Sequence, residues 1–157
     1  MTSKFAQIKS IFLAFGLMLS FFSVLDAQNR TTKHMAKGTF EVKMTPLPVE
    51  DGIGDPTIGR LAMDKTWSGD LAGTSKGQML GSQSETEKGS GGYVAMERFT
   101  GTLDGKKGSF SLQHHGTMDG GKFDINVSVI PGSGTGDLAG ISGTLKIIIE
   151  GSKSLRI

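Results

Sequence analysis

Tyr93-Val-Ala-Met-Glu-Arg-Phe-Thr-Gly-Thr-Leu103 has the pattern of a β-strand, and Asp104-Gly-Lys-Lys-Gly108 joins it to a second such stretch, Ser109–Met118. In both stretches the apolar residues recur with a period of two, which is typical of strands that bury one face. Turn residues that include glycine, placed between two strands, favour an antiparallel hairpin. The sequence therefore predicts a hairpin here.

The same pattern continues on both sides of the hairpin. Further strands are predicted at Lys37–Thr45, Arg60–Ser68, Thr74–Ser82, Lys122–Ile130 and Ile141–Ile149, with loops at 46–59 and 83–92 and a glycine-rich turn region at 131–140. The pentapeptide Gly-Asp-Leu-Ala-Gly occurs twice, at Gly69–Gly73 and Gly136–Gly140. We interpret it as a turn device, because glycine reaches positive φ angles without steric cost.

These observations predict an all-β fold, a small antiparallel β-barrel of seven to eight strands. No stretch favours a helix, because the apolar spacing stays at two and glycine recurs throughout. A β-sandwich would give a similar pattern. We favour a barrel because closure removes the exposed edges of a glycine-rich sheet. A barrel of about eight strands has room inside for side chains or for one small ligand.

The N-terminus has the layout of a secretory signal peptide. Lys4 and Lys9 precede or flank an almost wholly apolar stretch, Ile11–Leu25, which Asp26-Ala27 follows. We expect a signal peptide at 1–27, cleavage near Ala27, and export to the periplasm or the medium. An uncleaved anchor is the alternative, although the stretch is shorter than the roughly 20 residues that span a bilayer. We then expect a disordered tether at 28–35, the barrel domain at 36–151 and a C-terminal tail at 152–157.

Composition excludes several classes of function. The chain has no cysteine, so it forms no disulfide and carries no lipid on a cysteine. Its net charge is only +2, and it has one Trp and one Tyr, so we expect no nucleic-acid partner. We expect no contact with a membrane after signal cleavage and no cofactor. His114 and His115 point to opposite faces of a strand, so no metal site is expected.

A few polar residues share the apolar parity of their strands and are predicted to face inward. Glu97 lies on the parity of Phe99, Lys65 on that of Trp67, and His114 on that of Phe110. Glu97 and His114 belong to one hairpin, so they can meet as cross-strand or diagonal neighbours and exchange a proton with a ligand. The catalytic candidates are Glu97 and His114, and the ligand-binding candidates are Lys65, Trp67, Glu97, Phe110 and His114.

Two alternatives to this site stay open. A single bulge would reverse the parity and place Arg98 inside in place of Glu97. A buried Glu–His or Glu–Lys pair also often serves only to satisfy polar groups in a core.

Several ordered strings resemble a known family. They are Lys37-Gly-Thr-Phe-Glu-Val42, Met96-Glu-Arg-Phe-Thr-Gly-Thr-Leu103, Gly108-Ser-Phe-Ser-Leu-Gln-His114 and Pro131-Gly-Ser-Gly-Thr-Gly-Asp-Leu-Ala-Gly140. They resemble the bacterial domain-of-unknown-function family numbered 3224, over about Ala36 to Glu150. That family is similar in fold to the allene oxide cyclase barrel, which implies a central cavity and a homo-oligomer. Its members lack an established function and usually look cytoplasmic, whereas this chain carries an export signal.

Three functions follow as hypotheses. The first is an exported barrel that binds a small, largely apolar ligand, with Trp67 as a stacking wall and Glu97 or His114 orienting the polar end. The second is a cofactor-free isomerase or cyclase that uses the Glu97–His114 pair, an idea that rests on fold analogy. The third is a structural barrel with a filled core. Whether the chain is an enzyme is left open.

Overall fold

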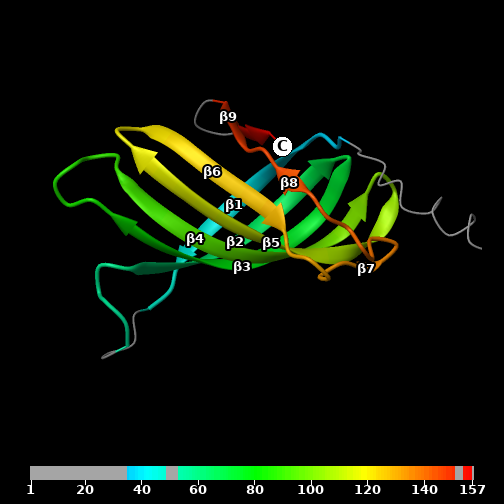
Figure 1. Ribbon diagram of the computed structural model, residues 1–157, viewed down its shortest axis with the longest axis horizontal. Helices are drawn as coiled ribbons and strands as arrows, with labels where there is room; N and C mark the ends of the chain where they lie inside the picture. The colour runs from blue at the N-terminus through cyan, green and yellow to red at the C-terminus, as the bar shows by residue number, and fades with distance from the viewer. Residues whose placement is uncertain (1–34, 49–52, 151–153, 157) are drawn as a thin grey trace, which may run out of the picture. The chain divides into compact units, whose positions relative to one another are not determined.

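The computed structural model describes residues 35–48, 53–150 and 154–156, and it contains strands and turns but no helix in those ranges (Figure 1). The strands are β1 (Gly38–Pro46), β2 (Gly59–Gly69), β3 (Leu71–Gln83), β4 (Gly91–Leu103), β5 (Lys106–Asp119), β6 (Lys122–Val129), β7 (Thr135–Gly136), β8 (Thr144–Leu145), β9 (Ile148–Glu150) and β10 (Ser154–Arg156). The predicted signal peptide lies outside the described residues, as does the tether up to residue 34.

All the strands belong to one antiparallel sheet. Its order is β8-β6-β5-β4-β3-β2-β1-β10-β9, and β7 pairs with the beginning of β5. The predicted hairpin is confirmed as β4 and β5, which pair from Gly91↔Met118 to Leu103↔Lys106. The all-β antiparallel class is therefore confirmed. No ladder joins β8 to β9 in the part of the chain that the structure describes, so closure of the barrel stays a prediction.

The long strands bend together, so the sheet has an inner and an outer face (Figure 1). Trp67, Glu97 and Phe110 are buried on the inner face. Four aromatic rings form a continuous row on the inner face. The ring centroids are 4.7 Å apart for Phe40 and Trp67, 6.3 Å for Trp67 and Phe99, and 5.0 Å for Phe99 and Phe110. Burying each such side chain stabilises the fold by about 1.5–3 kcal/mol. This row is the centre of the hydrophobic core.

The segment after β6 covers part of the inner face. Leu138 is buried in the core cluster, and Ile141, Leu145 and Ile147 pack against that cluster. The sequence predicted one strand at 141–149, but the structure has two short ones. The reason is a change of partner, since β8 pairs with β6 whereas β9 pairs with β10. In the segment predicted as a tail, β10 pairs with β1.

The two Gly-Asp-Leu-Ala-Gly copies make the same contacts at two places in the sheet. The Asp70 amide donates to the Lys37 carbonyl, and the Lys37 amide donates back to the Asp70 carboxylate at 2.8 Å. Asp137 repeats both hydrogen bonds with Lys107, the second at 3.3 Å. Gly69 and Gly136, which precede the aspartates, have φ angles of 112° and 61°, where other residues are strained. We call each set of contacts a Gly-Asp clamp.

Candidate functional site

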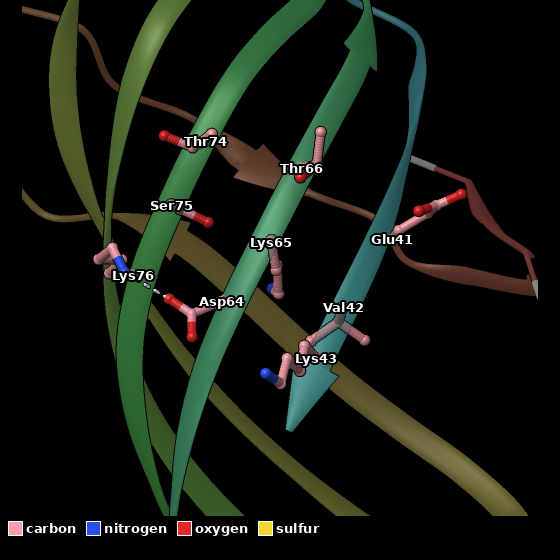
Figure 2. Close-up of a pocket in the computed structure, with 9 residues that line it drawn as sticks. All are labelled: Glu41, Val42, Lys43, Asp64, Lys65, Thr66, Thr74, Ser75 and Lys76. Atoms are coloured by element: carbon pink, nitrogen blue, oxygen red, sulfur yellow. Dashed lines mark hydrogen bonds and ion pairs between the residues drawn. The ribbon is translucent and has the colours of Figure 1, made fainter. Parts of the chain in front are cut away.

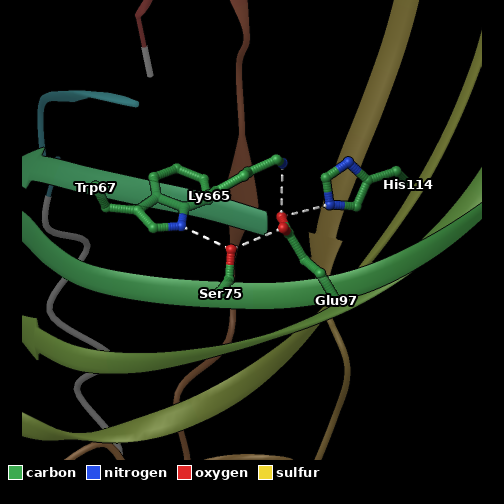
Figure 3. A network of polar contacts seen from close by, with 5 residues as sticks. All are labelled: Lys65, Trp67, Ser75, Glu97 and His114. Carbon is green, nitrogen blue, oxygen red and sulfur yellow. Dashed lines mark hydrogen bonds and ion pairs between the residues drawn. The ribbon is translucent and has the colours of Figure 1, made fainter. Parts of the chain in front are cut away.

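Four successive strands bring polar side chains together on the inner face. In the register of the sheet, Lys65 of β2 pairs with Ser75 of β3, and Gly77 of β3 pairs with Glu97 of β4. Glu97 pairs with Leu112 of β5, so His114, two residues further along β5, is its diagonal neighbour. Strand alternation points all four polar side chains to the same face. Figure 3 shows them converging on Glu97.

Glu97 accepts three hydrogen bonds from this group. Lys65 Nζ donates to Oε1 at 2.8 Å, His114 Nε2 lies 2.9 Å from the same oxygen, and Ser75 Oγ donates to Oε2 at 2.8 Å. Ser75 in turn accepts a hydrogen bond from Trp67 Nε1 at 2.8 Å. We call these five residues the Glu97 network. It is desolvated, since Lys65, Glu97 and His114 are only 6%, 3% and 5% exposed.

The network holds an ion pair away from water. Burial alone would raise the pKa of Glu97, but the hydrogen bond from His114 and the charge of Lys65 outweigh burial and lower the pKa to about 2. For Lys65 burial is the larger effect, so its pKa lies below the ordinary value in spite of the favourable charge of Glu97. Glu97 is therefore a carboxylate at neutral pH, and it stabilises a buried ammonium.

The ionised state of Glu97 decides which nitrogen of His114 carries hydrogen. A carboxylate only accepts hydrogen bonds, so Nε2 must be the N–H that donates to Oε1. Within the described residues no buried side-chain nitrogen or oxygen lacks a hydrogen-bond partner. The hydrogen bond of His114 to Glu97 uses Nε2, so Nδ1 is the ring nitrogen that takes no part in that bond.

The Lys65 ammonium also lies against two aromatic rings. Its Nζ is 4.6 Å from the centroid of the Phe40 ring and 5.1 Å from that of Trp67. Both distances are within the range of cation–π attraction. These rings help to compensate for the loss of water around the ammonium, and they join the network to the aromatic row.

A glycine makes room for the acid at the centre of the network. A Cβ at Gly77 would lie 2.6 Å from Glu97 Cβ and closer still to the Met96 carbonyl oxygen. Any other residue at position 77 would push β3 away from β4 at the point where Ser75 must reach Glu97. The glycine pattern of β3, which weakens its appearance as a strand, therefore serves the site.

The structure brings together four of the five sequence-predicted site residues, Lys65, Trp67, Glu97 and His114. Phe110 lies in the aromatic row, where its ring packs against that of Phe99. The alternative in which a bulge places Arg98 inside in place of Glu97 is wrong. Arg98 lies on the outer face, where its guanidinium donates to Ser111 at 3.3 Å and to Ser109 at 2.5 Å. That these residues bind a ligand or catalyse a reaction stays a prediction.

Sequence reasoning missed Ser75, whose side chain connects Trp67 to Glu97. It is 2% exposed. The signal was its parity, because Ser75 shares the inner parity of Leu71 and Met79 along β3. Three glycines of β3 on the same parity hid that signal, since a glycine shows neither burial nor exposure in a sequence pattern.

A second place with charged groups is a groove along β1, β2 and β3 (Figure 2). There Lys76 Nζ donates to Asp64 at 2.8 Å, with both side chains largely exposed. Each of them is adjacent in sequence to an inner-face residue and points to the outer face. Exposed ion pairs contribute little free energy, about 0–1 kcal/mol. Lys65 and Ser75 of the Glu97 network also line this groove, so we place the candidate site at the network and not at the exposed ion pair.

Among the described residues, no three His, Cys, Asp or Glu side chains gather in a way that could hold a metal ion. No helix among them is long and apolar enough to cross a membrane.

Comparisons with known proteins agree on one family. The model of a family described as "Protein of unknown function (DUF3224)" matches residues 36–157, beginning where the predicted domain begins. One similar solved structure is the crystal structure of a protein of unknown function from that family, from Shewanella oneidensis MR-1. Its sequence is 42% identical to this chain, and the two structures superimpose with a TM-score of 0.69. The match covers 76% of this chain and 90% of the Shewanella chain. No curated protein matches the chain. The relation in fold to allene oxide cyclase stays a prediction.

Proposed function

The chain belongs to the DUF3224 family of proteins of unknown function, and for this member we propose that the domain binds a small, largely apolar ligand on its inner face. The Glu97 network takes the polar end of the ligand. The observation that carries the proposal is a buried network of charged side chains, Lys65, Glu97 and His114, on an otherwise apolar face. Ligand sites commonly combine apolar walls with a few fixed polar groups.

Apolar side chains beside the network are incompletely covered. Val42 pairs with Lys65 in the register of β1 and β2, and it is 38% exposed. Met44, in the next inner position of β1, is also 38% exposed, and Met79, in the same cross-strand row as His114, is half-buried. A ligand with an apolar body would shield this surface from water, which is favourable by about 25 cal/mol per Å² buried.

The natural fluorescence of the protein reports on this site. Trp67 is the only tryptophan in the chain, and its Nε1 is part of the network. We expect organic extraction of the purified protein to release a molecule that mass spectrometry detects. We also test three probes that carry an eight-carbon chain, octanoate, 1-octanol and octyltrimethylammonium. At least one of them should change the Trp67 emission until the change reaches a plateau with increasing probe concentration. The proposal fails if extraction yields nothing and none of the three probes changes the emission.

Matched variants localise the effect. His114→Gln changes an inner-face residue, whereas His115→Gln changes its outer-face neighbour, which is exposed. Binding should weaken in the first variant and stay unchanged in the second. Equal binding in both variants would place the probe elsewhere and support the third hypothesis, a structural barrel with a filled core.

A second candidate function is isomerisation by proton transfer at His114. It is favoured by one observation, the pairing of His114 Nε2–H with a carboxylate, which fixes the tautomer and leaves Nδ1 to accept a proton. Glu97 is poorly suited to accept the proton itself, because its pKa is about 2. Incubating the extracted molecule with the protein in D2O should then add deuterium to it. The exchange should stop in His114→Gln and continue in His115→Gln; exchange in both would contradict this candidate.

We also propose export through the N-terminal segment. The support is the basic and apolar layout of residues 1–27, which the sequence alone shows. The mass of the protein recovered from the periplasm or medium of a bacterial producer should correspond to a chain that begins at Gln28. A protein of full-length mass that stays with the cytoplasm contradicts export, and one that stays with the membrane supports an uncleaved anchor.

The resemblance to barrel-forming relatives also leads us to propose a homo-oligomer. The outer face carries exposed apolar side chains on adjacent strands, since Leu80, Val94 and Met96 are 45%, 53% and 59% exposed. Single molecules seldom expose large contiguous apolar patches. Analytical ultracentrifugation over a range of concentrations measures the mass directly, and a monomer at every concentration would contradict the proposal.

A further inference from the structure

The hydrogen-bonding capacity left over in the Glu97 network identifies the chemistry of the ligand. Glu97 is largely saturated, because Oε1 accepts from Lys65 and His114 and Oε2 accepts from Ser75. On Lys65, the remaining capacity belongs to donors. An ammonium has three N–H groups, and one of those of Lys65 is directed to Glu97.

From these contacts we infer that the polar end of the ligand is an oxyanion, as in a carboxylate with an apolar body. The inference rests on the proposed function and specifies its substrate class. A carboxylate beside Lys65 Nζ accepts the free N–H groups of the ammonium.

A cationic ligand does not fit this centre. Its charge would lie beside that of Lys65, which is 6% exposed and therefore poorly screened by water. The two aromatic faces that would otherwise attract a cation, those of Phe40 and Trp67, are already occupied by the Lys65 ammonium.

A neutral ligand fits less well than an anion. It would displace water from the Lys65 N–H groups and supply at best an uncharged acceptor in return. An anion adds the attraction between opposite charges to its hydrogen bond with the ammonium, and water screens that attraction poorly at a buried site. We therefore expect octanoate to bind at least about tenfold more tightly than 1-octanol, which has the same number of carbons.

The apolar body is indicated by the position of the donors. Val42 lies next to Lys65 in the sheet register, and Met79 lies in the same row as His114. Both are incompletely buried. An anion at the donors thus brings its attached chain onto apolar side chains of the same face, so an amphipathic monoanion satisfies both requirements.

The test compares three probes of equal chain length by Trp67 emission. Octanoate should bind most tightly, 1-octanol at least about tenfold more weakly, and octyltrimethylammonium most weakly of all. Equal binding of octanoate and 1-octanol, or preference for the ammonium, overturns the inference while the proposed function stands. Absence of binding by all three overturns the proposed function itself.

Variants assign the preference to the network. Lys65→Met with Glu97→Gln removes both charges together, so no buried charge is left unpaired. It should bring octanoate down to the affinity of 1-octanol. Lys76→Met, which removes an exposed ammonium on the outer face, should preserve the preference for octanoate. The inference is overturned if the double variant keeps the preference or if Lys76→Met loses it.

Discussion

Glu97→Gln tests the energetics of the network most directly. Glutamine has almost the same shape, and its amide can still accept from His114 and donate to Ser75. What is lost is the negative charge that lies 2.8 Å from Lys65 Nζ, with the two side chains 0% and 4% exposed. Removing one partner of a buried ion pair leaves an uncompensated buried charge, which costs about 3–5 kcal/mol. We expect the free energy of unfolding to fall by that amount.

Urea unfolding at pH 7, followed by Trp67 emission and by far-UV circular dichroism, measures this loss. Glu41→Gln is the matched control, because Glu41 is exposed on β1 and its variant should change the free energy by less than about 0.5 kcal/mol. The double variant Glu97→Gln with Lys65→Met should recover most of the loss, since replacing a buried pair by neutral groups is often close to neutral. This variant also covers the case in which Glu97→Gln alone does not fold.

Two results would refute the reasoning. A loss below about 1 kcal/mol in Glu97→Gln would mean that Lys65 reaches water when its partner is removed. A double variant no more stable than Glu97→Gln would mean that the buried charge of Lys65 is not the source of the loss.

Three further predictions concern the same region. Glu97 has a pKa of about 2 in the folded protein against an ordinary 4.5, so its contribution is complete above about pH 5 and is lost as the pH falls toward 2. That contribution amounts to roughly 3 kcal/mol. The free energies of unfolding of wild type and Glu97→Gln should therefore approach each other as the pH falls over this range. A difference that stays constant with pH would contradict the lowered pKa. Ser75→Ala leaves Trp67 Nε1 buried without its acceptor and should cost about 1–3 kcal/mol with a shift in tryptophan emission, whereas Thr74→Ala, at an exposed position, should do neither. Gly77→Ala should lower the free energy of unfolding by about 1–3 kcal/mol through overpacking. Gly59→Ala should be tolerated, because the nearest atom lies 3.8 Å from the added Cβ. Equal effects of the two substitutions would contradict the close approach of β3 and β4.

The alternation of the sequence predicted most of the sheet because one face is buried. Along β5, Phe110, Leu112 and His114 alternate with residues that face outward, and this parity placed His114 correctly. The same reasoning placed Lys65 beside Trp67 and Glu97 beside Phe99. A local pattern is sufficient for these predictions, since the direction of a side chain in a strand depends only on its parity.

Features that depend on distant pairing could not be predicted in this way. The division of 141–149 into β8 and β9 follows from two different partner strands, and the strand nature of β10 follows from its pairing with β1. Ser75 was missed because its role requires both Trp67 and Glu97 to be in place. Val42 and Met44 share the parity of Phe40 but are more exposed, which depends on what covers each part of the inner face.

The two Gly-Asp clamps have a consequence for how the chain folds. Each clamp binds the backbone of one lysine, Lys37 in the first case and Lys107 in the second, through the same two backbone amides and one carboxylate. Because both clamps use the same groups, these hydrogen bonds alone do not distinguish Lys37 from Lys107. The correct pairing must come from elsewhere, above all from the long ladders of β2 to β5. A chain that closes a clamp before those ladders have formed is at risk of a kinetic trap, or of exchanging strands with a second molecule.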